Sequence, residues 1–161
     1  MPSPLSARQL LAKDVGRGKR TQADADAVLS RIKPAVSYDD LAGVDLVIEA
    51  VFEDRAVKED VIKRAEAVLP KDTIFATNTS TLPITSLAAA SLRPKNFVGI
   101  HFFSPVDRMM LVEIIMGKKT GEEALARRLR RHAQPHLREL ALAARLLDVF
   151  ARGFGGGADG L

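Results

Sequence analysis

Two polar side chains interrupt apolar runs of this sequence, and together they could move a proton. His101 lies in a predicted strand, Phe97 to Phe103, and Glu113 lies in another, Leu111 to Met116. If the chain folds back at the Ser-Pro pair between them, the carboxylate comes to lie against the imidazole. A carboxylate on one ring nitrogen fixes the tautomer and leaves the other nitrogen free to accept a proton. The pattern predicts a general base, with two satisfied structural residues as the alternative.

Polar residues also follow two other predicted strands. Phe52-Glu53-Asp54 comes after the apolar run Asp45 to Val51, and Asn78-Thr79-Ser80 comes after the strand Thr73 to Thr77. Parallel sheets bind ligands beyond the carboxyl ends of their strands. We therefore expect these segments and His101 to line a single cleft, although asparagine and serine at strand ends are commonly turn residues.

Helical and extended patterns alternate along the rest of the chain. The predicted elements are helices at Leu5 to Lys13, Gln22 to Lys33 (capped by Thr21), Arg55 to Leu69 and Leu82 to Ala90, a short strand at Ala35 to Tyr38, and a helical turn at Asp39 to Ala42. In the helix from Arg55, the apolar positions Val57, Val61, Ala65, Val68 and Leu69 are expected to face inward. Strand alternation puts Gly99 on the face of His101, and we expect its missing side chain to leave room beside the imidazole. The alternation of strands and helices predicts an α/β fold with a parallel sheet.

Composition narrows the class of protein. The chain has 161 residues, 47% of them hydrophobic and 27% charged, which is typical of a globular domain. It contains no cysteine, so disulfides and thiolate chemistry are excluded. No apolar run is long enough to span a membrane and the N-terminus lacks a signal-peptide core, so a cytoplasmic location is expected. The net charge of +4 suits phosphate-bearing partners, whether coenzymes or nucleic acid.

Three stretches carry a family resemblance. The segments I-H-F-F-S-P-V-D-R-M-M-L-V-E-I-I, D-L-V-I-E-A-V-F-E-D and A-T-N-T-S-T-L-P-I-T resemble the NAD-binding domain of L-3-hydroxyacyl-CoA dehydrogenases. The likeness runs from about Ser6 to Leu125 and is greatest to the domain found in multifunctional fatty acid β-oxidation proteins. It implies oxidation of an (S)-3-hydroxyacyl-CoA to the 3-ketoacyl-CoA, with NAD as the cofactor.

The resemblance also implies catalytic and substrate-binding roles. His101 would take the proton of the substrate hydroxyl, and Glu113 would orient its imidazole. Ser80 would hydrogen-bond the substrate oxygen, and Asn78 would help to shape that turn. These assignments agree with the general base that the His101 and Glu113 pattern predicts on its own.

Cofactor contacts are implied in the same way. Glu53, Lys58 and Ser80 match positions near NAD in the family. Ser104 stands where many members carry asparagine beside the nicotinamide, so it keeps a hydroxyl but has a shorter reach. No metal is expected, since His132 and His136 straddle Pro135 without a carboxylate partner.

The two ends of the sequence depart from the family pattern. The expected fold is a partial Rossmann-type parallel sheet in residues 1–125 that lacks the first strand and the glycine-rich loop, followed by a basic helical and Gly-rich tail in residues 126–161. A homo-oligomer or a partner could supply the missing parts. The alternatives are a catalytically incompetent remnant and a basic interaction module acting through the C-terminal helices. Nucleic acid is a disfavoured partner because no aromatic residues interleave the basic run Arg127 to Arg131.

Overall fold

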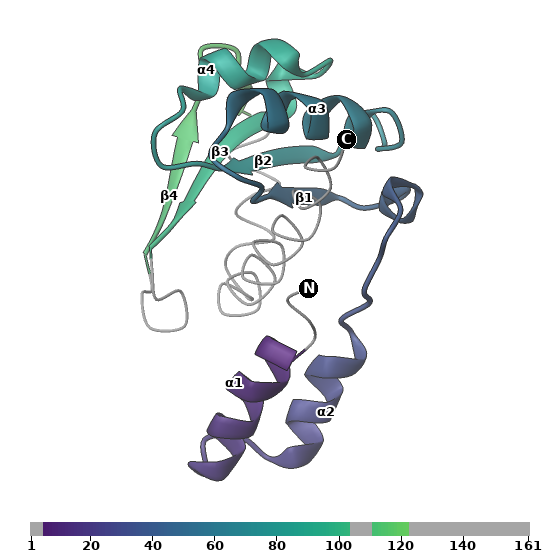
Figure 1. The fold of residues 1–161 in the computed structure, drawn as a ribbon, viewed down its shortest axis with the longest axis vertical. Coiled ribbons are helices and arrows are strands. Elements are labelled where there is room, and N and C mark those ends of the chain that lie inside the picture. The colour runs from purple at the N-terminus through teal and green to yellow at the C-terminus, as the bar shows by residue number, and fades with distance from the viewer. Residues whose placement is uncertain (1–4, 104–110, 123–161) are drawn as a thin grey trace, which may run out of the picture.

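A computed structural model describes residues 5–103 and 111–122 of the chain, and these contain a four-stranded sheet. The strands are β1 (Leu46–Glu49), β2 (Ile74–Asn78), β3 (Phe97–Phe102) and β4 (Val112–Met116), in that spatial order (Figure 1). The first three run parallel to one another, and β4 is antiparallel to β3. The prediction of an α/β fold is thus confirmed, and the fourth strand makes the sheet mixed.

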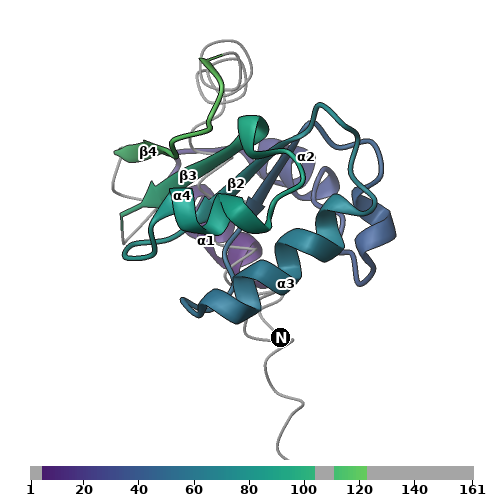
Figure 2. The same ribbon diagram turned by 90° about the horizontal axis from the view of Figure 1, so that it is seen from above.

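Two helices cover one face of this sheet. They are α3 (Arg55–Glu66) and α4 (Ile84–Leu87), and Figure 2 shows both on the same side of the strands. Ile62, Ile84 and Leu87 from this layer pack with Phe75 and Phe97 from the sheet. The two phenylalanine rings are stacked with their centroids 5.5 Å apart. This apolar layer holds the strand ends of β1, β2 and β3 in fixed relation, because a packed core resists deformation.

The N-terminal helices form a hairpin on the other side of the sheet. Helices α1 (Leu5–Gly16) and α2 (Gln22–Ser30) share a small core of Leu11, Ala25 and Val28 (Figure 1). The predicted cap at Thr21 is confirmed, since its hydroxyl accepts from the backbone N–H of Asp24, 3.1 Å away. Helix α2 ends at Ser30, before the predicted end at Lys33.

The segment between this hairpin and the sheet corrects one prediction. Residues 35–37 form no strand, and Val36 is 85% exposed. A 3₁₀ helix, η1 (Tyr38–Leu41), follows at once. The reason is local, because the Ser37 hydroxyl accepts from the backbone N–H of Asp39 and so caps the turn.

The inward face of α3 also differs from the prediction. Val57 is 41% exposed, whereas Lys58 and Glu66 are buried beside Ile62 and Ala65. The helix is therefore rotated so that two charged side chains face inward, each with an internal partner.

Short elements complete the described part of the chain. These are the 3₁₀ helices η2 (Ala88–Ala90) and η3 (Pro94–Asn96). Within residues 5–103 and 111–122, no helix is long and apolar enough to cross a membrane. Ser104, His132, His136 and the predicted C-terminal tail, residues 126–161, lie outside the described residues.

Candidate functional site

The carboxyl ends of the three parallel strands bring the predicted site residues together. Glu53 follows β1, Ser80 follows β2, and His101 is the second-last residue of β3. The backbone N–H of Ser80 donates to Glu53 Oε1 at 3.0 Å, and the Ser80 hydroxyl lies 3.3 Å from His101 Nε2. The predicted convergence of these segments is confirmed as geometry, and their roles stay predictions.

The His101 and Glu113 pair forms across the antiparallel ladder. The two residues are register partners in β3 and β4, and Nδ1 lies 2.9 Å from Glu113 Oε2. The imidazole is less exposed than the carboxylate, with side-chain exposures of 23% and 52%. Phe103 stands beside the imidazole, with ring centroids 4.5 Å apart. The fold-back that the sequence predicted therefore places the carboxylate on one ring nitrogen.

The contacts of the imidazole determine which nitrogen can accept a proton. An ionised carboxylate only accepts hydrogen bonds, so its neighbour Nδ1 carries the hydrogen. Nε2 of His101 then has a free lone pair, and the Ser80 hydroxyl can donate to it. A proton acceptor with an adjacent hydroxyl is the chemistry that this arrangement offers.

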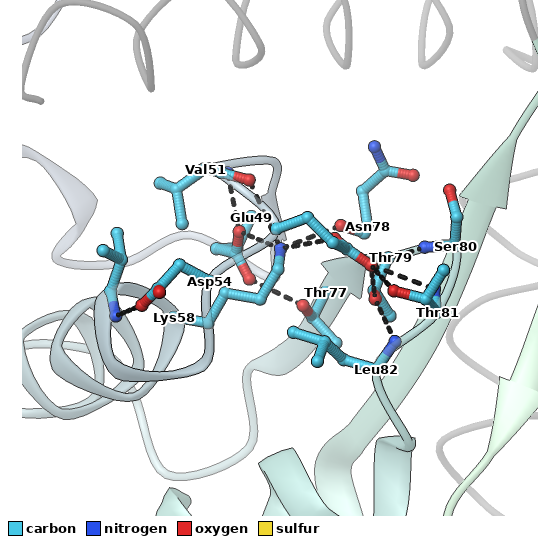
Figure 3. Close-up of polar contacts among 12 residues, drawn as sticks. Glu49, Val51, Asp54, Lys58, Thr77, Asn78, Thr79, Ser80, Thr81 and Leu82 are labelled. Carbon is cyan, nitrogen blue, oxygen red and sulfur yellow. Dashed lines mark hydrogen bonds and ion pairs between the residues drawn. The ribbon is translucent and has the colours of Figure 1, made fainter.

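The turn that carries Ser80 is organised by the Glu53 carboxylate. Oε1 of Glu53 accepts from the Thr79 hydroxyl and from the backbone N–H of both Ser80 and Thr81, at 3.0 Å each. The Leu82 backbone N–H donates in turn to the Thr79 hydroxyl at 3.0 Å, and Figure 3 shows residues 79 to 82 with their hydrogen bonds. The backbone donors of Ser80 and Thr81 are thus satisfied by an internal anion, and the turn is held before any ligand arrives.

The same contacts set the charge of Glu53. Partial burial raises the pKa of this carboxyl, but hydrogen bonds from Thr79, Thr81 and Ser80 outweigh it, with help from the Lys58 charge. The net effect lowers the pKa of Glu53 from 4.5 to about 2. Glu53 is therefore a stable anion at the end of β1 at neutral pH.

Asn78 connects the strand ends through both its side chain and its backbone. Its Oδ1 accepts from the backbone N–H of Phe102 at 3.4 Å, which ties the end of β2 to β3. Its carbonyl oxygen accepts from Lys58 Nζ at 2.9 Å. The position of Asn78 fits the predicted part in shaping the turn.

Lys58 lies beneath this site and is paired with Glu49. Their side chains are 0% and 1% exposed, and Nζ lies 2.9 Å from Glu49 Oε1 (Figure 3). Nζ is also 3.8 Å from Oε2 of Glu53. The sequence pattern does not predict this pair, because it indicates an apolar run from Asp45 to Val51. A charged residue inside a central strand was the available signal, because such a charge needs a buried partner.

Gly99 has a different neighbour from the one expected. A Cβ at this position would meet the side chain of Ile84, with Cγ1 only 2.6 Å away, and Ile115 Cβ at 3.0 Å. The space is therefore taken by α4 and β4, and the expectation that it serves the imidazole is wrong. Glycine is needed here for close packing of Ile84 on the sheet.

The residues at the strand ends fit one part of a dinucleotide better than a metal. Ser80 links the His101 imidazole to the anionic carboxylate of Glu53, and Phe52, the residue before Glu53 in the chain, is 50% exposed and offers an apolar surface. A ligand ring that carries polar substituents can bind to polar side chains and to an apolar surface at the same time. Among residues 5–103 and 111–122, no three histidine, aspartate or glutamate side chains are grouped so as to hold a metal ion.

Comparison with known families identifies a matching domain. The family model described as "3-hydroxyacyl-CoA dehydrogenase, NAD binding domain" matches residues 5–134. The match includes all the described residues and extends past the predicted boundary at 125. The division into residues 1–125 and 126–161 stays a prediction.

Curated relatives and solved structures agree with this match. Fatty acid oxidation complex subunit alpha from Psychrobacter arcticus is 54% identical over 120 residues, and that from Acinetobacter baylyi is 52% identical over 120. Each alignment covers 74% of this chain and 17% of the relative, so the chain spans about a sixth of their length. The crystal structure of 3-hydroxybutyryl-CoA dehydrogenase from Escherichia coli K12 superposes with a TM-score of 0.75 at 34% identity, over 88% of this chain and 28% of that one. An (S)-3-hydroxybutyryl-CoA dehydrogenase from Ralstonia eutropha gives 0.70 at 34% identity, over 87% and 45%.

Proposed function

Because the chain belongs to the 3-hydroxyacyl-CoA dehydrogenase family through its NAD-binding domain, we propose that it oxidises an (S)-3-hydroxyacyl-CoA to the 3-ketoacyl-CoA in fatty acid β-oxidation. One observation carries the proposal. His101 has Glu113 on Nδ1 and leaves Nε2 open toward the Ser80 hydroxyl. Oxidation of an alcohol needs a base for the hydroxyl proton, and this imidazole has the form of one.

Four residues of the chain have separate roles in the proposed proton transfer. His101 takes the substrate hydroxyl proton at Nε2, and Glu113 stabilises the imidazolium that results. Ser80 donates a hydrogen bond to the substrate oxygen, and Asn78 keeps that part of the turn in place. As the proton leaves, the substrate carbon gives up a hydride and becomes a carbonyl.

The cofactor of the proposed reaction is NAD, which accepts the hydride when bound. Glu53 and Ser80 would contact it at the strand ends, and Ser104, outside the described residues, is assigned to the same role by resemblance alone. Lys58 is the fourth residue assigned to this role by resemblance, and its ammonium is 2.9 Å from Glu49 and covered by the site. The exposed face of Phe52 adds an apolar surface next to Glu53.

The names of the relatives support a proposal for the substrate class and the assembly. They are named as alpha subunits of a fatty acid oxidation complex, and this chain matches 17% of their length. We infer an acyl-CoA substrate and further protein, whether a second copy or another polypeptide, to complete its site. The net charge of +4 suits the phosphates of both coenzymes.

The experiment follows NADH formation from NAD and an (S)-3-hydroxyacyl-CoA by the purified chain. We expect His101→Ala to lower kcat/KM at least about a hundredfold, since it removes the base. Glu122→Gln, a change at an exposed residue of the described segment, serves as the matched control and should leave the rate unchanged. Equal rates for the wild-type chain and His101→Ala contradict the proposal.

A binding measurement separates the enzyme from the remnant. The chain is titrated with NADH while the nicotinamide fluorescence is followed, and circular dichroism verifies that it is folded. Saturable binding supports a working cofactor site, and a folded chain that shows no binding at millimolar NADH supports the remnant.

A further inference from the structure

The buried pair of Glu49 and Lys58 is fully satisfied by internal contacts. Oε1 of Glu49 accepts from Lys58 Nζ at 2.9 Å and from the Val51 backbone N–H at 2.7 Å. Its Oε2 accepts from the Thr77 hydroxyl at 2.6 Å. Within the part of the chain that the structure describes, every buried side-chain nitrogen and oxygen has a hydrogen-bond partner. The pair is therefore fully hydrogen-bonded at a buried position where apolar residues would also pack.

The contacts of the Lys58 ammonium join the segments that carry the site. Besides Glu49, Nζ donates to the carbonyl oxygens of Asn78 at 2.9 Å and Val51 at 3.4 Å. Its remaining charged neighbour is Glu53, at 3.8 Å. The ammonium thus contacts the carboxyl ends of both β1 and β2. Val51 lies two residues before Glu53, and Asn78 lies one residue before Thr79.

We propose that Glu49 is a positioning residue of this site, which acts through Lys58 to hold the 79–81 turn and with it the Ser80 hydroxyl against His101. The inference rests on the proposed function for its consequence in catalysis. Its structural part is that a buried carboxylate controls the turn, and this part does not depend on which reaction the site performs.

Loss of the Glu49 charge would change the surroundings of the Lys58 ammonium. Without it, the Lys58 ammonium keeps two carbonyl partners and only the more distant Glu53 as a counter-charge. The ammonium then draws toward Glu53, whose carboxylate also accepts from the backbone of Ser80 and Thr81. A shift there moves Ser80, because both its N–H and the preceding Asn78 carbonyl belong to this network.

A purely stabilising role is the competing explanation. Buried ion pairs often contribute no more to stability than apolar residues of the same size. What favours positioning is that the partners of Nζ are backbone carbonyls at two strand exits and a carboxylate of the site. By contrast, Glu66, a buried carboxylate on α3, accepts hydrogen bonds from the Ser91 hydroxyl and the Leu92 backbone N–H, away from the residues of the site.

The test compares Glu49→Gln with Glu59→Gln in the full chain. Glu59 lies on α3, one residue from Lys58, and pairs with Arg55 at the surface, so it is the matched control. Hydrogen exchange is measured at the amides of Ser80 and Thr81 and, as a reporter of global stability, at Ile74, which donates to the Asp45 carbonyl. We expect protection at the two turn amides to fall about tenfold more than at Ile74 in Glu49→Gln, and no such difference in Glu59→Gln.

Equal loss at all three amides, or no loss at the turn, overturns the proposal. Should Glu49→Gln fail to fold, Thr77→Val removes only the hydroxyl that anchors Oε2 of Glu49 and is expected to give the same selective loss with a smaller size. In a chain that turns over substrate, Glu49→Gln should also lower kcat on the order of tenfold while KM changes little, since misplacement of a reacting group acts on kcat. A selective loss of protection at the two turn amides, in a chain that shows no turnover, supports the positioning inference and contradicts the proposed dehydrogenase activity.

Discussion

His101 and Glu113 stand directly opposite each other in the antiparallel ladder of β3 and β4, and Nδ1 and Oε2 lie 2.9 Å apart. Directly paired residues on neighbouring strands have their Cβ atoms about 5 Å apart, so the ladder itself delivers the contact. The pair therefore depends on strand register and not on the conformation of a loop.

This relationship adds little to stability. The Glu113 side chain is 52% exposed, and an ion pair at the surface contributes at most about 1 kcal/mol. A histidine and a carboxylate held this way at the strand ends are better explained by chemistry than by folding. The first prediction follows from that difference.

Glu113→Gln should impair catalysis with little effect on folding. The amide cannot stabilise an imidazolium as a carboxylate does, so we expect kcat to fall about a hundredfold. The free energy of unfolding should change by less than about 1 kcal/mol. NADH formation and urea denaturation measure the two quantities, with Glu122→Gln as the control. A full-rate Glu113→Gln chain would show that the carboxylate is not part of the proton chemistry.

Ser80→Ala should weaken the reaction by a smaller factor. The hydroxyl lies 3.3 Å from His101 Nε2 and offers one neutral hydrogen bond, so its removal should cost about 1 kcal/mol, or about fivefold in kcat/KM. The backbone N–H that binds Glu53 is kept in the variant, so the turn should remain. Steady-state rates are compared with those of Ser86→Ala on α4. Equal rates in both variants would remove the Ser80 hydroxyl from the site.

The lowered pKa of Glu53 predicts how stability depends on pH. The carboxyl has a pKa of about 2 in the folded chain and an ordinary value of 4.5. A depressed pKa means that the ionised form stabilises the fold above about pH 4.5, and that this contribution is lost as the pH falls toward 2. The side chain is 38% exposed, so solvent screening reduces the effect to about 1 kcal/mol.

Glu53→Gln tests this dependence directly. The difference in unfolding free energy between the wild-type chain and the variant should be constant from neutral pH to about pH 5, and should shrink steadily below it. Urea denaturation of both chains over this range provides the measurement. Asp39→Asn, at an exposed carboxyl on η1, serves as the control. A difference that grows as the pH falls would mean that the sign is wrong.

The sequence predicted those parts of the fold that depend on local pattern. The β-branched and aromatic runs around Phe75 and Phe97 gave the correct strands, and Thr21 gave the correct cap. The contact between His101 and Glu113 also followed from pattern, since a buried face restricts the register of two adjacent strands. These features need no knowledge of distant parts of the chain.

Tertiary contacts determined what the sequence could not predict. Lys58 is buried because Glu49, nine residues earlier, needs a counter-charge, and this turns Val57 toward solvent. The stretch after Pro34 is an exception, because its cause is local: none of the described strands pairs with residues 35–37, and Ser37 caps a 3₁₀ helix there. The role of Gly99 depended on Ile84, which lies 15 residues before it in the chain and on another element.

Gly99→Ala is predicted to destabilise the fold through a clash with Ile84. The added Cβ would meet Cγ1 of Ile84 at 2.6 Å, and Ile84 is only 4% exposed, so it has little space to move. Overpacking of this kind costs about 1–3 kcal/mol in unfolding free energy. Gly16→Ala, with nothing within 4 Å of the new methyl group, is the control and should not lower stability.

A second substitution tests the cause of that loss. Ile84→Ala removes both Cγ1 and Cδ1, the two atoms nearest the added methyl group, so the double variant Gly99→Ala/Ile84→Ala should be more stable than the sum of the two single changes predicts. We expect a favourable coupling of about 1 kcal/mol, measured by urea denaturation of all four chains. Strict additivity would show that the loss of stability does not come from the close approach of Ile84.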